Sequence, residues 1–237
     1  MAAGGATLAS SRLRRMAQQA AEQKAAELEP CEMCGEPIAP QHRHVVDLSS
    51  RELKCICRAC KILFDRPASG GDHYRLVPDR RLRIPDLALD DALWESLRVP
   101  VDMAFFFHHS EAERVLAFYP GPMGATESQL ELHAWRELEA ANPLLATLEP
   151  DVEALLVNRA RGAREHFLVP IEDAYDLVGL IRTRWRGLTG GQEAWEGIQD
   201  FFETLTKRSK EATTEGSASR PAPVGAGGGE ETATWRS

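Results

Sequence analysis

The residues of this sequence with the clearest chemistry are its five cysteines, which all lie within thirty residues of one another. A C-x-x-C hook, a gap of twenty residues and a C-x-C-x-x-C run place them at Cys31, Cys34, Cys55, Cys57 and Cys60. Thiolates repel one another unless a cation lies between them, and two C-x-x-C hooks offer four soft ligands to one tetrahedral ion. A disulfide framework tends to spread an even number of cysteines through the fold. We therefore predict a metal site.

The two symmetric hooks define the ligands that we predict, which are Cys31, Cys34, Cys57 and Cys60. Four sulfurs in tetrahedral geometry favour zinc, and the same set would also hold iron. Cys55 lies two residues before Cys57 and faces the same way along a strand, so it could replace Cys57 or remain beside the site as a reduced thiol. His42 and His44 could also substitute for one sulfur, although we expect them to be exposed loop histidines.

A closed set of four cysteines leaves no coordination position for a substrate or a water molecule, so we predict a structural metal and not a catalytic one. A module of about 40 residues has too small a core to fold without such a staple. Gly35, directly after Cys34, fits the tight turn of a metal-binding knuckle.

The elements around the cysteines are short. Residues 44–48 and 53–57 read as two strands joined by a turn at 49–51, and residues 61–64 read as a short helix after Cys60. The order of knuckle, hairpin, second hook and helix is typical of a zinc ribbon or a treble clef. It is also similar to the His-containing treble-clef endonucleases. Their second histidine after the last cysteine is missing here, because that position is Lys61, so we expect shared architecture without nuclease activity.

The rest of the folded chain predicts an α+β domain over residues 71–208, in which helices pack on an antiparallel sheet. The expected strands are 73–77, 81–84, 101–107, 114–119, 152–158 and 165–169, of which the last four form two hairpins. The expected helices are a short one from Asp90, one from Thr126 or Ser128 to Asn142, one over 172–186 and one over 192–208. The loop from Tyr119 to Thr126 reads as a rigid strand-to-helix connection, with an anion-binding loop as the alternative.

Four segments follow from these patterns: a disordered or frayed helical N-terminus at 1–29, a zinc-binding module at 30–70, the α+β domain at 71–208 and a disordered tail at 209–237. The net charge of −8 argues against a nucleic-acid binder. Neither a membrane-spanning run nor the apolar part of a secretory signal is evident, so we expect a cytoplasmic protein.

No residues combine into a catalytic motif. His108, His109 and Glu111 could form a metal or acid–base cluster, but they read as a solvated turn between two strands. His133 and His166 are isolated, and no serine lies in a nucleophile elbow. We therefore predict a protein that is not an enzyme.

Several blocks of the sequence resemble a bacterial family of unknown function. They are C-E-M-C-G-E-P-I, H-R-H-V-V-D-L, C-I-C-R-A-C-K-I-L-F-D, Y-P-G-P-M-G-A-T-E-S, P-D-V-E-A-L-L-V-N-R and F-L-V-P-I-E-D-A-Y-D-L-V-G-L-I-R, and the resemblance covers about residues 30–208. Genes of that family lie beside nickel–iron hydrogenase genes, so the resemblance implies a role in hydrogenase assembly or operation. It brings no catalytic residues.

The leading hypothesis is an adaptor or accessory protein that binds zinc and a protein partner, such as a hydrogenase subunit or maturation factor. The first alternative is a redox or metal-delivery protein for an iron–sulfur cluster or nickel, in which Cys55 is the functional thiol. The second alternative is a treble-clef protein that binds nucleic acid.

Overall fold

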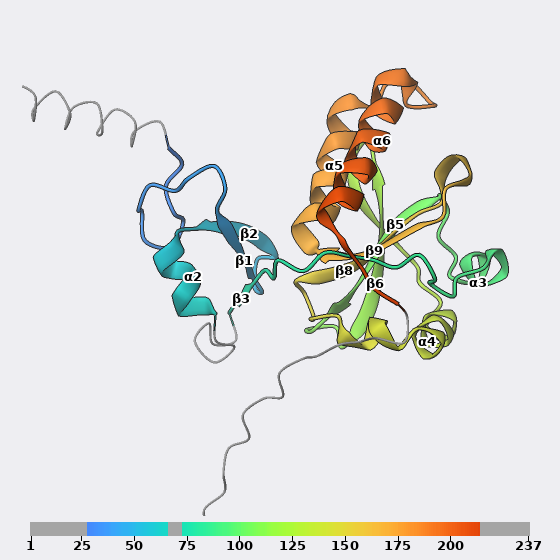
Figure 1. Cartoon of the computed structure of the whole chain (residues 1–237), viewed down its shortest axis with the longest axis horizontal. Coiled ribbons are helices and arrows are strands. Elements are labelled where there is room, and N and C mark those ends of the chain that lie inside the picture. The colour runs from blue at the N-terminus through green and yellow to red at the C-terminus, as the bar shows by residue number, and fades with distance from the viewer. Residues whose placement is uncertain (1–27, 66–72, 214–237) are drawn as a thin grey trace, which may run out of the picture.

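The computed structural model describes residues 28–65 and 73–213, which form a small cysteine-containing module and a larger domain (Figure 1). The helix or disorder expected before residue 28, the boundary expected between residues 70 and 71 and most of the expected C-terminal tail lie outside the described residues.

The small module, residues 28–65 and 73–77, is built on a three-stranded antiparallel sheet of order β2-β1-β3. Its elements are β1 (Arg43–Asp47), β2 (Glu52–Ile56), α2 (Arg58–Phe64) and β3 (Tyr74–Leu76). The expected order of hairpin, second hook and short helix is therefore confirmed. β3 pairs with β1, so this sheet includes residues beyond position 70, where the sequence patterns end the module.

The larger domain contains a seven-stranded sheet of order β10-β4-β9-β8-β5-β6-β7. Its strands are β4 (Leu82–Arg83), β5 (Met103–His109), β6 (Arg114–Gly121), β7 (Gly124–Ser128), β8 (Glu153–Asn158), β9 (Glu165–Pro170) and β10 (Lys210–Glu211). The two expected hairpins, β5–β6 and β8–β9, are present, and β5 pairs with β8 to join them. Every pairing is antiparallel except that of β10 with β4, so the fold is α+β with a mixed sheet.

Helices cover both faces of this sheet, which explains why β5 is almost continuously apolar. Phe105 and its neighbours at positions 103 and 107 pack into the cluster under α5 (Ile171–Arg184) and α6 (Gly191–Arg208). Phe106 points to the opposite face, where it meets α3 (Asp91–Ser96) and α4 (Leu132–Ala141). Short 3-10 turns at Pro143–Thr147 and Ala160–Gly162 complete the layers. The domain therefore has three layers and two separate hydrophobic cores.

The stretch from Tyr119 to Thr126 differs from its prediction. β6 continues to Gly121 and β7 begins at Gly124, so this stretch is a β-hairpin and not a strand-to-helix connection. Gly124 has a φ of 118°, which lets the chain reverse in a conformation that other residues rarely adopt. Thr126 is an extended residue paired with Tyr119, and α4 begins only at Leu132, so the helix start predicted at Thr126 or Ser128 is wrong.

Two arginines of the segment that connects the module to the domain are paired with buried carboxylates. Arg80 forms a bidentate pair with Glu153, to which it donates from Nε and Nη2 at 2.8 and 2.5 Å. Arg81 forms the same bidentate pair with Asp173, at 2.6 and 2.8 Å. Val46 of β1 also packs into the core beneath α5 and α6. The module therefore lies directly against the domain.

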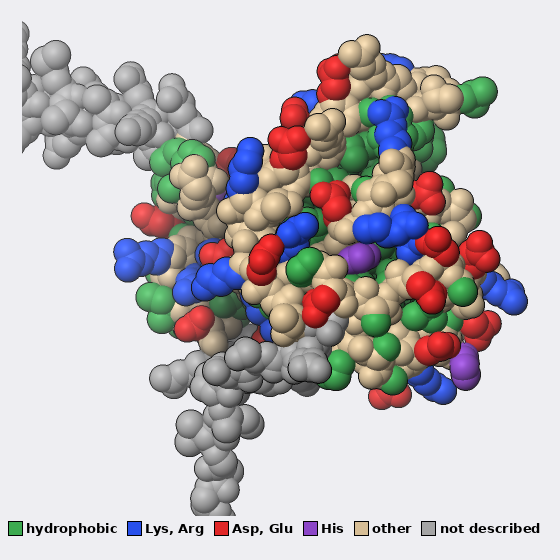
Figure 2. Space-filling model, turned by 45° about the vertical axis from the view of Figure 1, so that its right-hand side comes forward, with side chains coloured by type: hydrophobic (Ala, Val, Ile, Leu, Met, Phe, Trp, Pro, Cys, Tyr) green, Lys and Arg blue, Asp and Glu red, His purple; other side chains and the backbone are tan. Residues whose placement is uncertain are grey.

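The end of the described chain returns to the sheet. The Lys210 N–H donates to the Arg81 carbonyl, and the Ala212 N–H donates to the Arg83 carbonyl, at 3.0 and 2.9 Å. The residues just after 209, where the sequence predicts a tail, thus form β10. On the face of the molecule in Figure 2, acidic and basic side chains are interspersed and neither sign dominates.

Candidate metal centre

The first hook of the centre is a knuckle in which the chain turns back over Cys31. The Cys31 carbonyl accepts a hydrogen bond from the Gly35 N–H at 2.8 Å, and the Cys31 N–H donates to the Glu36 carbonyl at the same distance. Gly35 has a φ of 78°, so the position after Cys34 requires the left-handed conformation that glycine adopts without strain. This turn brings Cys31 and Cys34 to one side of the chain.

The second hook begins α2. Cys57 is the N-cap residue of this helix, and its sulfur accepts a hydrogen bond from the Cys60 N–H at 3.4 Å. The Cys57 N–H in turn donates to the sulfur of Cys31 at 3.2 Å, which links the two hooks. Helical spacing places Cys57 and Cys60 on the same side of the first turn.

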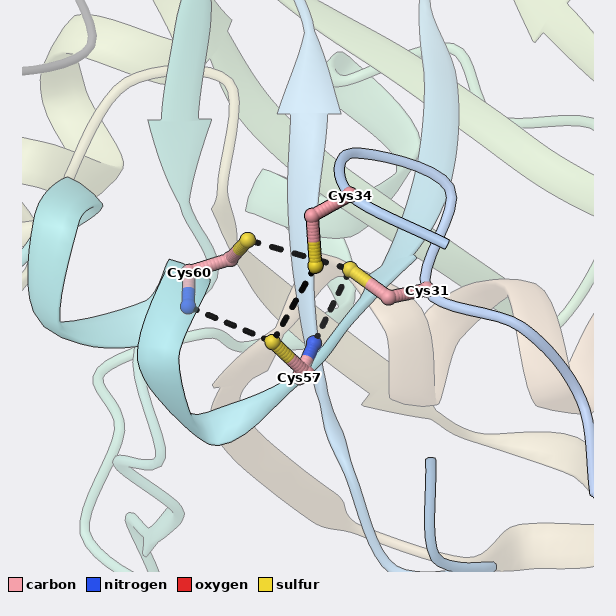
Figure 3. A group of neighbouring side chains, drawn as sticks. All are labelled: Cys31, Cys34, Cys57 and Cys60. Carbon is pink, nitrogen blue, oxygen red and sulfur yellow. Dashed lines mark hydrogen bonds between the residues drawn. The ribbon is translucent and has the colours of Figure 1, made fainter. Parts of the chain in front are cut away.

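The four sulfurs predicted as ligands come together (Figure 3). Sγ of Cys31 lies 3.8 Å from Sγ of Cys60, Sγ of Cys34 lies 3.6 Å from Sγ of Cys57, and all four sulfurs lie within 4.8 Å of one another. A tetrahedral ion with metal–sulfur bonds of about 2.3 Å requires sulfur–sulfur edges of about 3.8 Å. This group could therefore hold a metal ion.

Backbone donors and burial act in opposite directions on these thiols. Burial tends to raise the pKa of Cys31, but backbone N–H groups of Cys57, Met33 and Cys34 outweigh burial and lower this pKa to about 6. Burial and the neighbouring thiols raise the pKa of Cys60. Sulfurs this close cannot all ionise without a cation between them, which is the electrostatic condition for a metal-binding cluster.

The sulfur of Cys55 lies outside the four-cysteine group and forms a different group with His42 and His44. The sequence suggested that both histidines are exposed loop residues, which is not what the structure shows. Both are half-buried, and His44 belongs to β1. Among the described residues, these three and the four-cysteine cluster are the two groups with the ligand atoms and spacing to hold a metal.

The residues that position the module could not be predicted from sequence patterns. Asp151 of the domain has a fully buried side chain and accepts from Arg51 at 2.6 Å and from Arg75 at 2.8 Å, both of which belong to the module. Glu172, in the first turn of α5, accepts from Nδ1 of His44 at 2.6 Å, and this hydrogen bond is the main cause of the raised pKa of His44. These partners are about a hundred residues apart in the chain, so local patterns could not pair them.

The other histidine cluster considered from the sequence is dispersed. His108 and His109 are the last residues of β5, and Nε2 of His108 lies 3.4 Å from Glu139. Nδ1 of His109 accepts from the Ala112 N–H at 3.0 Å, and the Glu111 side chain is exposed. Neither histidine joins a metal-binding group in the described part of the chain.

A groove of about 860 Å³ lies at the far end of α5 and α6 and is lined by Arg161, Trp185, Leu188 and Trp195, among others. The guanidinium of Arg161 stacks over the ring of Trp195 at 4.2 Å from its centroid. The residues that line this groove include no histidine or cysteine, so it is separate from both candidate metal-binding groups.

Comparison with known proteins identifies one family. A model of a family of unknown function, DUF5947, matches residues 30–209, so the chain belongs to this family. No curated protein and no solved structure matches the chain. None of the helices in the described ranges has the length and apolar character needed to cross a membrane.

Proposed function

We propose that this member of the DUF5947 family is a zinc-binding adaptor protein that is not an enzyme, and that Cys31, Cys34, Cys57 and Cys60 hold one structural Zn²⁺. The observation that carries the proposal is the pair of sulfur–sulfur distances, 3.6 and 3.8 Å, which match the edges of a zinc tetrahedron. A set of four sulfurs leaves no position for a catalytic water.

The module is best described as a treble clef. Its knuckle is followed by the β1–β2 hairpin, and its second hook is the start of α2, since Cys57 caps that helix. A zinc ribbon would not need this helix. Zinc would then close the loop between the knuckle and α2 and stabilise a module whose own core is small.

An adaptor must hold its binding surfaces in a defined arrangement, and the ion pairs of Arg51 and Arg75 with Asp151 support such an arrangement here. For the partner, we propose a nickel–iron hydrogenase subunit or maturation factor in the cytoplasm, on the basis of the family resemblance of the sequence blocks. The mixed charge of the surface in Figure 2 favours a protein partner over nucleic acid.

Elemental analysis of the untagged protein, purified in air and under anaerobic conditions, tests the metal. We expect colourless protein with tightly bound zinc under both conditions, and loss of this zinc in Cys57→Ser but not in Cys55→Ser. Coloured protein that loses iron in air would instead support the redox alternative.

Affinity capture from native cells tests the partner, with Cys57→Ser as the matched control for an intact module. We expect the wild-type protein to enrich a hydrogenase subunit or maturation factor, and the variant to enrich it less. Capture with no such protein enriched would contradict the adaptor role in hydrogenase assembly.

A further inference from the structure

His42, His44 and Cys55 form a second group of potential ligands on the β1–β2 hairpin. The register of this hairpin places His44 directly opposite Cys55 on the neighbouring strand, so both side chains lie on the same face. His42 precedes His44 by two residues, and its ring lies edge-on to that of His44 with centroids 4.7 Å apart. Their ligand atoms and the Cys55 sulfur all lie within 4.8 Å of one another.

Both imidazole rings are held through the same nitrogen. Nδ1 of His42 lies 2.9 Å from the Ala39 carbonyl, and Nδ1 of His44 lies 2.6 Å from a carboxylate oxygen of Glu172. A carbonyl and a carboxylate can only accept hydrogen bonds, so Nδ1 carries a proton in both rings, and Nε2 has the free lone pair when the ring is neutral. Proteins orient metal-binding histidines in this way, with the distal nitrogen fixed by an oxygen acceptor.

The free nitrogen of His42 provides an independent observation. His42 Nε2 is one of three buried side-chain nitrogens without a hydrogen-bond partner in the described part of the chain. Leaving a buried polar atom unsatisfied is unfavourable, so such an atom calls for an explanation. A cation shared with His44 and Cys55 would satisfy it.

We propose that Nε2 of His42, Nε2 of His44 and Sγ of Cys55 form a second metal site, separate from the four-cysteine centre. Two imidazoles and one thiolate suit a borderline-soft ion such as Zn²⁺, Ni²⁺ or Cu⁺, and they do not suit Mg²⁺ or Ca²⁺. Three protein ligands leave one position of a tetrahedron for water or for a donor from another molecule, so this ion exchanges more readily than the one held by four cysteines. The site does not depend on the adaptor function proposed above.

The arrangement also connects the second site to the domain, because Glu172 belongs to α5 and not to the module. Glu172 would act as a positioning residue that fixes the ring of His44. Binding of an ion at this site would therefore strengthen the contact between β1 and the start of α5.

Titration of the full, untagged chain with Zn²⁺, in competition with a chromophoric chelator, tests the proposal. We expect two classes of binding, one tight equivalent and one weaker equivalent. His42→Ala, His44→Ala and Cys55→Ser should each remove the weaker class and keep the tight one. Glu172→Gln should keep two equivalents but weaken the second about 10–100-fold.

His73→Ala is the matched control, because it removes an exposed imidazole from the same module. We expect this variant to bind both equivalents as the wild type does. Substitution with Co²⁺ gives a second readout: the absorption of the weaker class should show one thiolate and nitrogen ligands, and that of the tight class four thiolates.

Wild-type protein that binds a single equivalent of Zn²⁺ would overturn the proposal without reference to any variant. A second equivalent that persists unchanged in all three ligand variants would also overturn it, because the ion would then be bound elsewhere. Retention of the tight equivalent in each variant shows that the module has folded.

Discussion

The two parts of this molecule bury very different cores. The module buries one small cluster, in which three of the six buried residues are cysteines of the candidate metal centre, alongside Ile38, Val45 and Ile56. The larger domain buries phenylalanines, leucines and valines on both faces of its sheet, and Phe105 and Phe106 are fully enclosed. If the four cysteines hold the zinc that we propose, the comparison teaches that ligand bonds can replace apolar area where the chain is too short to build a core.

Removal of the proposed zinc should give the largest difference in stability between the module and the domain. Because binding to structural zinc sites contributes about 10–16 kcal/mol in small peptides, we expect a chelator, or Cys60→Ser, to unfold the module and leave the domain folded. Hydrogen exchange would measure this as lost protection of β1 and β2 with unchanged protection of β5 and β8.

Cys55→Ser is the control for this experiment, since it removes a thiol from the same hairpin but not from the four-cysteine centre. We expect its β1 and β2 amides to remain protected. If the chelator removes the ion and the hairpin of the wild type also stays protected, the module does not depend on its metal and the comparison fails.

A cavity in the core of the domain should destabilise the domain and leave the module folded. Phe106→Ala removes a fully buried ring that stacks on Trp135 and packs against Trp94, so the free energy of unfolding of the domain should fall by about 3–5 kcal/mol. Urea denaturation would measure this loss, while the zinc that we propose at the four cysteines should remain bound. Leu188→Ala, at a fully exposed residue, is the control and should have little effect.

Loss of the contact between the module and the domain should have an effect of intermediate size. Asp151→Ala removes the carboxylate that accepts from Arg51 and Arg75, and hydrogen bonds to charged groups contribute about 1.5–3 kcal/mol. We expect faster hydrogen exchange in β1 and β3 with metal still bound. Glu111→Ala, which removes a weak and exposed partner of Arg51, should leave exchange unchanged. Equal exchange in both variants would show that Asp151 does not hold the module in place.

The same carboxylate predicts a dependence on pH. Burial tends to raise the pKa of Asp151, but hydrogen bonds from Ser110 and Arg51 outweigh it and hold this pKa below its usual range. A folded-state pKa below the unfolded value of about 3.9 means that the contribution to stability is full above that pH and is lost as the pH falls through the folded-state pKa. The stability difference between wild type and Asp151→Asn should therefore shrink in acid. A difference that stays constant between pH 7 and pH 3 would contradict this assignment.

Loss of a surface ion pair of the module should have the smallest effect on stability. Lys61 lies 3.9 Å from Asp65, one helical turn away, and both side chains are more than a third exposed. We expect Lys61→Ala to change the free energy of unfolding by less than about 0.5 kcal/mol and to leave the metal content unchanged. A loss of metal in this variant would mean that α2 needs more support than its two cysteines provide.

Local spacing predicted the four-cysteine group, because a C-x-x-C hook needs only one turn of chain to bring its two sulfurs together. It also predicted the strands of both hairpins. It failed at Thr126 and Ser128, which are typical N-cap residues, because pairing with β6 outweighs the local preference for a helix. It could not indicate Glu172 as a partner of His44, since the two are joined only through the packing of the module on α5.

Part of the second candidate group, His42, His44 and Cys55, could be predicted from the sequence. The predicted strands 44–48 and 53–57, paired end to end, would place His44 opposite Cys57, whereas the register of the structure places it opposite Cys55, two residues away on the same face. What the strands could not show is the direction of the two imidazole nitrogens. That direction depends on the Ala39 carbonyl and on Glu172, and therefore on the folded structure.

The arginines of the connecting segment have a consequence for dividing the protein into fragments. Arg80 and Arg81 belong to neither part alone, because they lie between β3 and β4 while their carboxylate partners lie deep in the domain. A fragment that starts after residue 81 would leave Glu153 and Asp173 as enclosed negative charges with no cation beside them. The smallest piece of the larger domain that can be expressed in soluble form should therefore begin before Arg80, on the module's side of the junction.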